Sequence, residues 1–277
     1  SGGGTAGLEA ACTAAEVGCN TFLLEKGSEL GGLASLISKI PAKNRLADFP
    51  HYLMHRAEQL ENLYIFTNTE GTPENIRKFH PNIIVSSTGS APLLPPIAGL
   101  KDRIDNENYN IYSILGMISH INDFPKDLEG KKVVVVGGGA VGLDVVEFFA
   151  DRNADISIVE MMDQIGRDLD PVSKNDTKAM MKKHNVHQLT KTALLEVKDS
   201  SFLVKGDGEP YELPFEYGFV CLGMRAQGQL YQSLAEEFSS EDVEIMNIGD
   251  SQRARRIIDG TQEGRNILTI LEQRGYL

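Results

Sequence analysis

Two glycine-rich segments with the same spacing are the residues of this sequence best suited to chemistry. GGGAVG at residues 137–142 and GGGTAG at residues 2–7 both follow the pattern G-x-G-x-x-G. In such a segment the first glycine permits a tight turn, the second lets backbone approach a pyrophosphate, and the third lets a helix pack closely on a strand. The free N–H groups at the start of that helix attract phosphate. Each segment therefore predicts a dinucleotide site, and the alternative is a glycine-rich turn that binds no ligand.

An acidic residue stands at the matching place after each glycine segment. Glu160 ends the run DISIVE, and Glu25 ends the run TFLLE. A carboxylate at the end of this strand can accept hydrogen bonds from both ribose hydroxyls and would repel the 2′-phosphate of NADP. Met161 and Met162, rather than an arginine, follow Glu160. We therefore expect NAD(H) rather than NADP(H) in the second site, unless Glu160 is only a solvated strand end.

These matches belong to an internal repeat. Residue 2 corresponds to residue 137, an offset of 135 positions, and at this offset Gly31 corresponds to Gly166. Near the end of each unit, IIVSSTG at 83–89 resembles GFVCLGM at 218–224. Each unit therefore carries the signals of one nucleotide-binding half.

The elements that must position the glycine segments can be read from the flanking residues. In the second unit, residues 131–136 predict a buried parallel strand, residues 141–150 a helix, and residues 155–160 the next strand. The first unit repeats the helix at 8–17 and the strand at 21–25. The strand before Gly2 has no counterpart, because the sequence begins inside the motif. We therefore expect a fragment of a longer protein, or one whose upstream residues are not represented, in which the first unit lacks its first strand.

The remaining elements are predicted more coarsely. Helices are expected at 46–60, 72–79, 110–121, 170–184 and 255–271, strands at 63–66 and 243–248, an extended segment at 91–96 and a hairpin at 194–208.

The overall composition narrows the class of protein. The 277 residues are 41% hydrophobic and 24% charged, which is ordinary for a globular protein with room for two domains. A formal net charge of −12 makes nucleic acid and anionic membrane surfaces poor partners. No apolar run is long enough for a transmembrane helix. Three cysteines without a pattern, and no signal peptide, predict a cytoplasmic protein.

The motifs resemble those of flavoproteins that bind two dinucleotides, with FAD in the first unit and a pyridine nucleotide in the second. More closely, the chain resembles the C-terminal FAD/NAD(P)-binding module of the Old Yellow Enzyme-like NADH:flavin oxidoreductases, the group of 2,4-dienoyl-CoA reductase, 2-enoate reductase and trimethylamine dehydrogenase. The resemblance covers nearly the whole chain. Its most specific stretches include GGGTAGLEAA at 2–11, KKVVVVGGGAVGLDVVEF at 131–148 and IGDSQRARRIIDGTQEG at 248–264. It implies an α/β fold of two Rossmann-like domains, the FAD domain formed by 1–108 and 224–277 and the inserted NAD(H) domain by 109–223.

The resemblance also implies which residues meet each cofactor. For FAD these are Gly2, Gly4, Thr5, Ala6, Gly7, Glu25, Lys26, Gly32, Thr88, Gly89, Gly249 and Asp250. For NAD(H) they are Gly137, Gly139, Ala140, Val141, Gly142, Glu160 and Gly223. Judged without the resemblance, Gly31-Gly32 is an ordinary loop, and Asp250 is as readily a helix cap. The arginines at 253, 255 and 256 either face a flavin or a neighbouring domain, or form a solvated helix start.

Absent residues narrow the chemistry further. Dithiol reductases of related fold need two cysteines beside the flavin, but Gly32 is followed by LASL, so disulfide exchange is excluded. Four clustered cysteines for an iron–sulfur centre are also missing. The six histidines have no partners at ligand spacing, so we expect no metal site.

The function implied by the resemblance is hydride transfer from NADH to N5 of FAD, which needs positioning rather than a catalytic acid or base. Electrons would then pass to an upstream barrel of the same parent chain, which holds FMN and a [4Fe-4S] cluster and reduces an enoate or dienoyl-CoA type substrate. One alternative is a non-catalytic fragment that binds ADP or NAD. The other is a stand-alone NADH dehydrogenase or ferredoxin reductase. A homo-oligomer is compatible with all of these.

Overall fold

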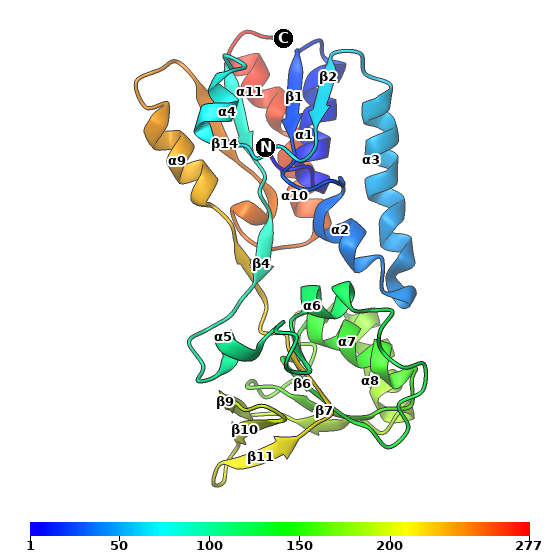
Figure 1. Cartoon of the computed structure of the whole chain (residues 1–277). Coiled ribbons are helices and arrows are strands. Elements are labelled where there is room, and N and C mark those ends of the chain that lie inside the picture. The colour runs from blue at the N-terminus through cyan, green and yellow to red at the C-terminus, as the bar shows by residue number, and fades with distance from the viewer. The chain divides into compact units, whose positions relative to one another are not determined.

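The computed structural model describes all 277 residues, which divide into two compact units (Figure 1). Unit 1 comprises Ser1–Lys39, Lys43–Ala91 and Met224–Leu277, and unit 2 comprises Ile40–Ala42 and Pro92–Gly223. Residues 92–108, which the sequence analysis assigned to the first domain, group with unit 2. The assignment of one cofactor to each domain stays a prediction.

Unit 2 is built on a parallel sheet of five strands, in the order β5-β12-β6-β7-β8. The central strand is β6 (Lys132–Val136), whose four valines are all buried. A strand covered on both faces needs such an unbroken apolar run. Its neighbours are β5 (Ile111–Tyr112), β7 (Asp155–Val159), β8 (His187–Leu189) and β12 (Tyr217–Val220).

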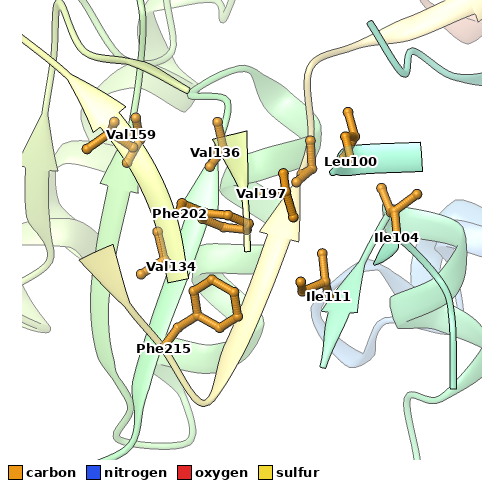
Figure 2. Packing of buried hydrophobic residues seen from close by; sticks show 11 residues of the cluster. Leu100, Ile104, Ile111, Val134, Val136, Val159, Val197, Phe202 and Phe215 are labelled. Carbon is orange, nitrogen blue, oxygen red and sulfur yellow. The ribbon is translucent and has the colours of Figure 1, made fainter. Parts of the chain in front are cut away.

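A second, antiparallel sheet completes unit 2. It contains β9 (Ala193–Val197), β10 (Ser201–Lys205) and β11 (Tyr211–Pro214), so the predicted hairpin is present and gains a third strand. Its residues share one hydrophobic core with the parallel sheet. Figure 2 shows the ring of Phe202, from β10, in the middle of that cluster beside valines of β6. The rings of Phe202 and Phe215 pack against each other at a tilt, with 4.5 Å between their centroids.

Four helices belong to unit 2: α5 (Leu100–Arg103), α6 (Ile114–Ser119), α7 (Ala140–Ala150) and α8 (Pro171–Lys183). The helix predicted over 110–121 is wrong in its first part. Ile111 is a buried residue of β5, and Ser113 then caps α6 by accepting a hydrogen bond from Gly116 N. Asp105 holds this cap, because its carboxylate accepts from both Ser113 N (2.8 Å) and Ser113 Oγ (2.6 Å).

Unit 1 contains two separate pairs of parallel strands. β1 (Thr21–Leu24) pairs with β2 (Leu63–Phe66), and β3 (Ile83–Ser86) pairs with β14 (Glu244–Asn247). In Figure 1 the chain start, marked N, lies between β1 and β14. Helix α1 (Thr5–Glu16) is largely buried and packs against α3 (Asp48–Glu58), α10 (Ile257–Arg265) and α11 (Ile267–Gln273).

The single helix predicted at 255–271 is two helices, because Asn266 ends α10 and begins α11. The remaining elements are α2 (Gly32–Ile37), η1 (Pro41–Ala47), α4 (Pro73–Arg77), β4 (Ser90–Pro92), β13 (Met224–Ala226), α9 (Gln229–Glu237) and η2 (Gly249–Ser251).

The predicted α/β class with two Rossmann-like units is confirmed. Every strand pair of the large sheet and of the two unit 1 pairs is parallel. Each glycine segment leads directly into a helix, as the sequence predicts. No helix of the structure combines the length and the apolar character needed to cross a bilayer.

Candidate dinucleotide-binding sites

The glycine segment of unit 2 turns sharply after β6 in a way that only glycine permits. Gly137 has φ +110°, and a Cβ there would lie 2.1 Å from the carbonyl oxygen of Cys221. A Cβ on Gly142 would lie 1.9 Å from the carbonyl oxygen of Gly137. The first glycine therefore makes the turn, and the third lets α7 approach the strand end.

Unit 1 has the same turn, built from different neighbours. Gly2 has φ +102°, and a Cβ there would lie 2.3 Å from the carbonyl oxygen of Ser87. A Cβ on Gly7 would lie 1.9 Å from the carbonyl oxygen of Gly2. The repeat in the sequence is thus a repeat of backbone geometry.

The middle glycine of each segment faces open space. A Cβ on Gly139 would meet no atom within 4 Å, and one on Gly4 would meet only Gly32 Cα at 4.0 Å. Gly4 and Gly139 are the N-cap residues of α1 and α7, and no side chain caps either helix. The first N–H groups of a helix have no acceptor within it. The space before each helix therefore has the shape and polarity to hold a pyrophosphate. Thr5, Ala6, Ala140 and Val141 are the first residues of these helices.

The acidic residue after each β-strand is held by its own glycine segment. Glu25 accepts hydrogen bonds from Gly3 N and Gly27 N, both at 2.7 Å. Glu160 accepts from Gly138 N at 2.6 Å and from Met162 N at 2.7 Å. Each carboxylate is half-buried and fixed in direction. Its remaining lone pairs can accept ribose hydroxyls. Lys26 and Met161, which follow the two acids, are exposed.

Gly31-Gly32 lies against the glycine segment of unit 1. Gly31 N donates to Gly3 O at 2.8 Å, and a Cβ on Gly32 would lie 2.9 Å from Gly4 Cα. The pair therefore lies beside the N-terminus of α1, where the resemblance places the cofactor, and not in a remote loop.

Gly249 and Asp250 lie at the same helix start. A Cβ on Gly249 would lie 2.9 Å from Ala6 Cβ. Asp250 accepts from Ser90 Oγ at 2.9 Å and from Arg255 N at 3.0 Å. The structure thus places a fixed carboxylate close to the first turn of α1.

Two residues that support this loop were missed by the sequence analysis. Glu263 accepts from Gly249 N at 2.7 Å, and Ser90 is the partner of Asp250. Ser90 is 160 residues from Asp250, and Glu263, although it lies in the stretch 248–264, is 14 residues from Gly249, so neither pairing shows as a local pattern. Arg255 forms an ion pair with Glu263 at 2.6 Å, and Arg256 N, at the start of α10, donates to Asp259 Oδ2 at 3.1 Å. The arginine patch thus has partners within unit 1, which favours the helix-start interpretation.

The other predicted residues lie at strand ends. Thr88 follows β3, and its hydroxyl donates to the carbonyl oxygen of Gln227 at 2.5 Å. The carbonyl oxygen of Gly89 accepts from Gln227 N at 3.0 Å. Gly223 follows β12, is exposed, and has φ +103° with no atom near its Cβ direction.

The three cysteines are all free thiols. Burial raises the pKa of the Cys221 thiol to about 12 and that of Cys12 to about 11. A reactive cysteine needs a lowered pKa, because the thiolate is the nucleophile. These two thiols therefore stay protonated at neutral pH. The structure contains no group of three or more His, Cys, Asp or Glu residues placed to hold a metal ion.

The sequence pattern of the pyridine nucleotide-disulphide oxidoreductases matches residues 2–246, which is most of the chain. This chain belongs to that family. Membership places the chain among oxidoreductases that bind FAD and NAD(P)H. The disulphide in the family name has no counterpart here, because no cysteine pair lies near the FAD-type glycine segment.

Known proteins of this family match nearly the whole chain. The NADH oxidase of Thermoanaerobacter brockii is 27% identical over 264 residues, which are 95% of this chain and 39% of that protein. The metal reductase of Desulforamulus reducens is 27% identical over 301 residues, covering 96% of this chain and 42% of that protein. The structure of 2-naphthoyl-CoA reductase in complex with 2-naphthoyl-CoA superposes with a TM-score of 0.81 at 23% identity, covering 96% of this chain and 38% of that one.

These matches confirm the resemblance to the C-terminal module of the Old Yellow Enzyme-like reductases. This chain spans about two fifths of the length of each of these proteins.

Proposed function

We propose that this oxidoreductase module binds FAD in unit 1 and NADH in unit 2 and passes a hydride from NADH to the flavin. The observation that carries the proposal is the duplicated site. In each unit an uncapped helix start faces open space beside a carboxylate held by two amides. One such arrangement per unit is what two dinucleotides require.

The residues of the chain would bind and orient rather than react. The amides at the start of α1 and α7 would hold the two pyrophosphates, and Glu25 and Glu160 would each hold a ribose. Ser90 and Glu263 hold the Gly249–Asp250 loop in place. The Asp250 carboxylate would then face the ribitol and phosphate end of FAD. When bound, FAD supplies the acceptor for a hydride, and the protein supplies position and electrostatics.

Glu160 supports NADH rather than NADPH as the donor. Both of its oxygens already accept backbone amides, which fixes the direction of the carboxylate, and in the proposed site a ribose 2′-substituent would approach it. A phosphate there would meet a fixed negative charge. The two residues that follow Glu160 in the chain, exposed Met161 and Met162, carry no positive charge.

The module is proposed to feed a further part of a longer cytoplasmic enzyme. Its relatives are more than twice as long, and their names include an oxidase and reductases. The proposed partner is a barrel carrying FMN and a [4Fe-4S] cluster, which would deliver the electrons to an enoate or dienoyl-CoA type substrate. The support for this step is the resemblance alone.

Reconstitution with FAD followed by anaerobic titration with NADH tests the proposal. The protein is mixed with FAD, desalted, and its visible absorbance is followed as NADH is added. We expect retained flavin that bleaches with NADH. Retained flavin that NADH leaves oxidised would contradict hydride transfer and favour a nucleotide-binding module without turnover.

A matched set of glycine variants makes the titration specific. In Gly139→Ala the new methyl group enters open space without a clash, so the fold is kept while NADH binding is lost. Gly4→Ala should in the same way lose flavin retention. The control is Gly208→Ala, where a Cβ also meets nothing within 4 Å but lies in a hairpin far along the sequence from either segment. Normal NADH bleaching in Gly139→Ala would refute the assigned phosphate site.

A further inference from the structure

A three-residue turn is repeated in the two units, in addition to the glycine segments. It comprises residues 67–69 after β2 in unit 1 and residues 190–192 after β8 in unit 2. In each turn the hydroxyl of the last threonine donates to the carbonyl oxygen of the first, at 3.0 Å in unit 1 and 2.9 Å in unit 2. The middle residue has φ +50° in unit 1 and +51° in unit 2. The two turns therefore share one left-handed backbone conformation.

In unit 2 this turn is bonded to the segment that carries the proposed ribose-binding acid. Thr192 N donates to Glu160 O, and Lys191 N donates to Met162 O, both at 2.9 Å. Met162 N in turn donates to the Glu160 carboxylate at 2.7 Å. The turn and the carboxylate thus belong to one hydrogen-bonded group, and the backbone of Lys191 lies beside the proposed ribose site.

Unit 1 makes the same bonds around a different central residue. Thr69 N donates to Glu25 O at 2.9 Å, and Asn68 N donates to Gly27 O at 2.8 Å. Asparagine tolerates the left-handed conformation, because its short polar side chain can hydrogen-bond locally. Lys191 has no such compensation, so the turn of unit 2 carries a residue that costs stability at its position.

The side chain of Lys191 brings a positive charge to this place. It is exposed and forms no ion pair within the chain, so its charge is available to a ligand. A flexible four-carbon stem carries the ammonium, whose three donors suit phosphate oxygens. The substituent that distinguishes NADPH from NADH is a phosphate on the adenosine ribose, which is the ribose that Glu160 would hold.

We propose that Lys191 determines how strictly unit 2 selects NADH over NADPH, an inference that rests on the proposed pyridine nucleotide site. Glu160 repels the 2′-phosphate, and the Lys191 ammonium pairs with the same phosphate and offsets part of that repulsion. Unit 2 therefore binds both nucleotides, with a preference for NADH that is smaller than Glu160 alone would give. Lysine occupies a strained position because its charge serves the ligand, at a cost in stability that Asn68 avoids in unit 1.

Isothermal titration with NAD⁺ and NADP⁺ tests this assignment, because the oxidised forms differ by the same phosphate and donate no hydride. Lys191→Asn copies the central residue of unit 1. It should raise the dissociation constant for NADP⁺ about fivefold and change that for NAD⁺ less than about twofold, as loss of an exposed ion pair predicts. Lys191→Arg should keep NADP⁺ binding, because it keeps the charge. At high ionic strength the difference between wild type and Lys191→Asn should shrink.

A matched control removes the same charge elsewhere in unit 2. Lys131 is exposed and precedes β6, whose other end leads into the glycine segment. Lys131→Asn should leave both dissociation constants unchanged. Urea denaturation is measured in parallel, and there Lys191→Asn should raise the midpoint, because asparagine adopts the turn with less strain.

Two results would overturn the proposal. One is an equal ratio of the two dissociation constants in the wild type and in Lys191→Asn at low salt, which would make Lys191 a solvated residue only. The other is a lower urea midpoint for Lys191→Asn, which would refute the strain at this turn. Failure of the proposed function looks different. A wild type that binds neither nucleotide would refute the site itself, and this inference with it, whereas NAD⁺ binding with an unchanged ratio would leave the site standing.

Discussion

At the scale of single residues, Glu25 and Glu160 each connect two parts of a site. Each carboxylate accepts a hydrogen bond from the second residue of its glycine segment, Gly3 N or Gly138 N. It accepts another from a residue just after its own strand, Gly27 N or Met162 N. These bonds fix the side chain before a ligand arrives, which lowers the entropy cost of binding. Through these hydrogen bonds each carboxylate orders its glycine segment, in addition to orienting a bound ribose.

Crossed substitutions of the two acids separate the two cofactor sites. Glu160→Gln weakens its hydrogen bonds to ribose and leaves the shape of the residue, so NADH affinity falls by about 10- to 100-fold, as loss of a charged hydrogen bond predicts. Glu25→Gln lowers FAD retention by a similar factor. Isothermal titration with NADH and flavin release on desalting measure the two effects. Each variant is the control for the other, and a change of both affinities in either variant would show that the sites are not independent.

Cys221 makes stability depend on alkaline pH. Its pKa is about 12 in the folded protein and 9.0 for an unperturbed thiol, because burial disfavours the thiolate. A raised folded pKa gives stability that is complete below pH 9 and is lost as pH rises toward 12. The wild-type free energy of unfolding should therefore fall more steeply above pH 9 than that of Cys221→Ala, by up to about 1.4 kcal/mol per pH unit. Urea denaturation between pH 7.5 and 10.5 checks this, and parallel curves for the two proteins would contradict it.

At the scale of elements, a charged cluster joins three helices of unit 1. Arg56 on α3 contacts Glu9 at 2.9 Å and Glu16 at 2.5 Å, both on α1. Arg265 on α10 reaches the other oxygen of Glu9 at 3.2 Å. The Glu9 side chain is only 4% exposed, and these two arginines are its ion-pair partners. The Arg56 guanidinium also holds the pKa of Glu16 below its usual range.

Removing Arg56 should therefore cost more than removing an exposed arginine. Arg56→Met leaves the buried Glu9 carboxylate with Arg265 as its one remaining ion-pair partner, and we expect a loss of about 3 kcal/mol in the free energy of unfolding. The control is Arg45→Met, whose ion pair with Asp48 is 90% and 66% exposed and should cost less than about 1 kcal/mol. Glu9→Gln combined with Arg56→Met should recover part of the loss. Equal midpoints for Arg56→Met and Arg45→Met in urea would refute this assignment.

The same scale shows how far sequence reasoning extends. The strand–glycine–helix–strand units were predictable, because β-branched runs, glycine spacing and strand-end acids are local signals. The boundary between β5 and α6 could not be predicted, because it depends on the hydrogen bonds that the Asp105 carboxylate accepts from Ser113. Nor were Glu263 and Ser90, which hold the Gly249–Asp250 loop through tertiary contacts. Geometry set by distant segments has no short pattern to reveal it.

At the scale of the whole molecule, each unit has hydrophobic clusters of its own. One cluster joins the two sheets of unit 2, and three smaller clusters lie within unit 1. Unit 2 has a continuous five-stranded sheet, whereas unit 1 has no sheet of more than two strands. The two units should therefore differ in stability.

Differential scanning calorimetry should resolve two transitions, with unit 1 unfolding first. NADH should shift only the upper transition and FAD only the lower one. A ligand at 100 times its dissociation constant contributes about 2.7 kcal/mol to the unit that binds it. The Glu160→Gln and Glu25→Gln variants identify the transitions, because each should remove one shift. A single transition that both ligands move together would show that the chain unfolds as one cooperative body.

The repeat also gives the molecule an internal reference. Gly2 N and Gly137 N make bonds of the same length, 2.8 Å, to the last residues of corresponding strands. Both amides experience the same temperature, acidity and solvent in one tube, so those influences cancel in the ratio of their exchange rates. What does not cancel is the difference between a strand that is flanked on both sides and one that is not. The ratio of the two exchange rates, measured in one sample, thus compares the two units without a second protein for calibration.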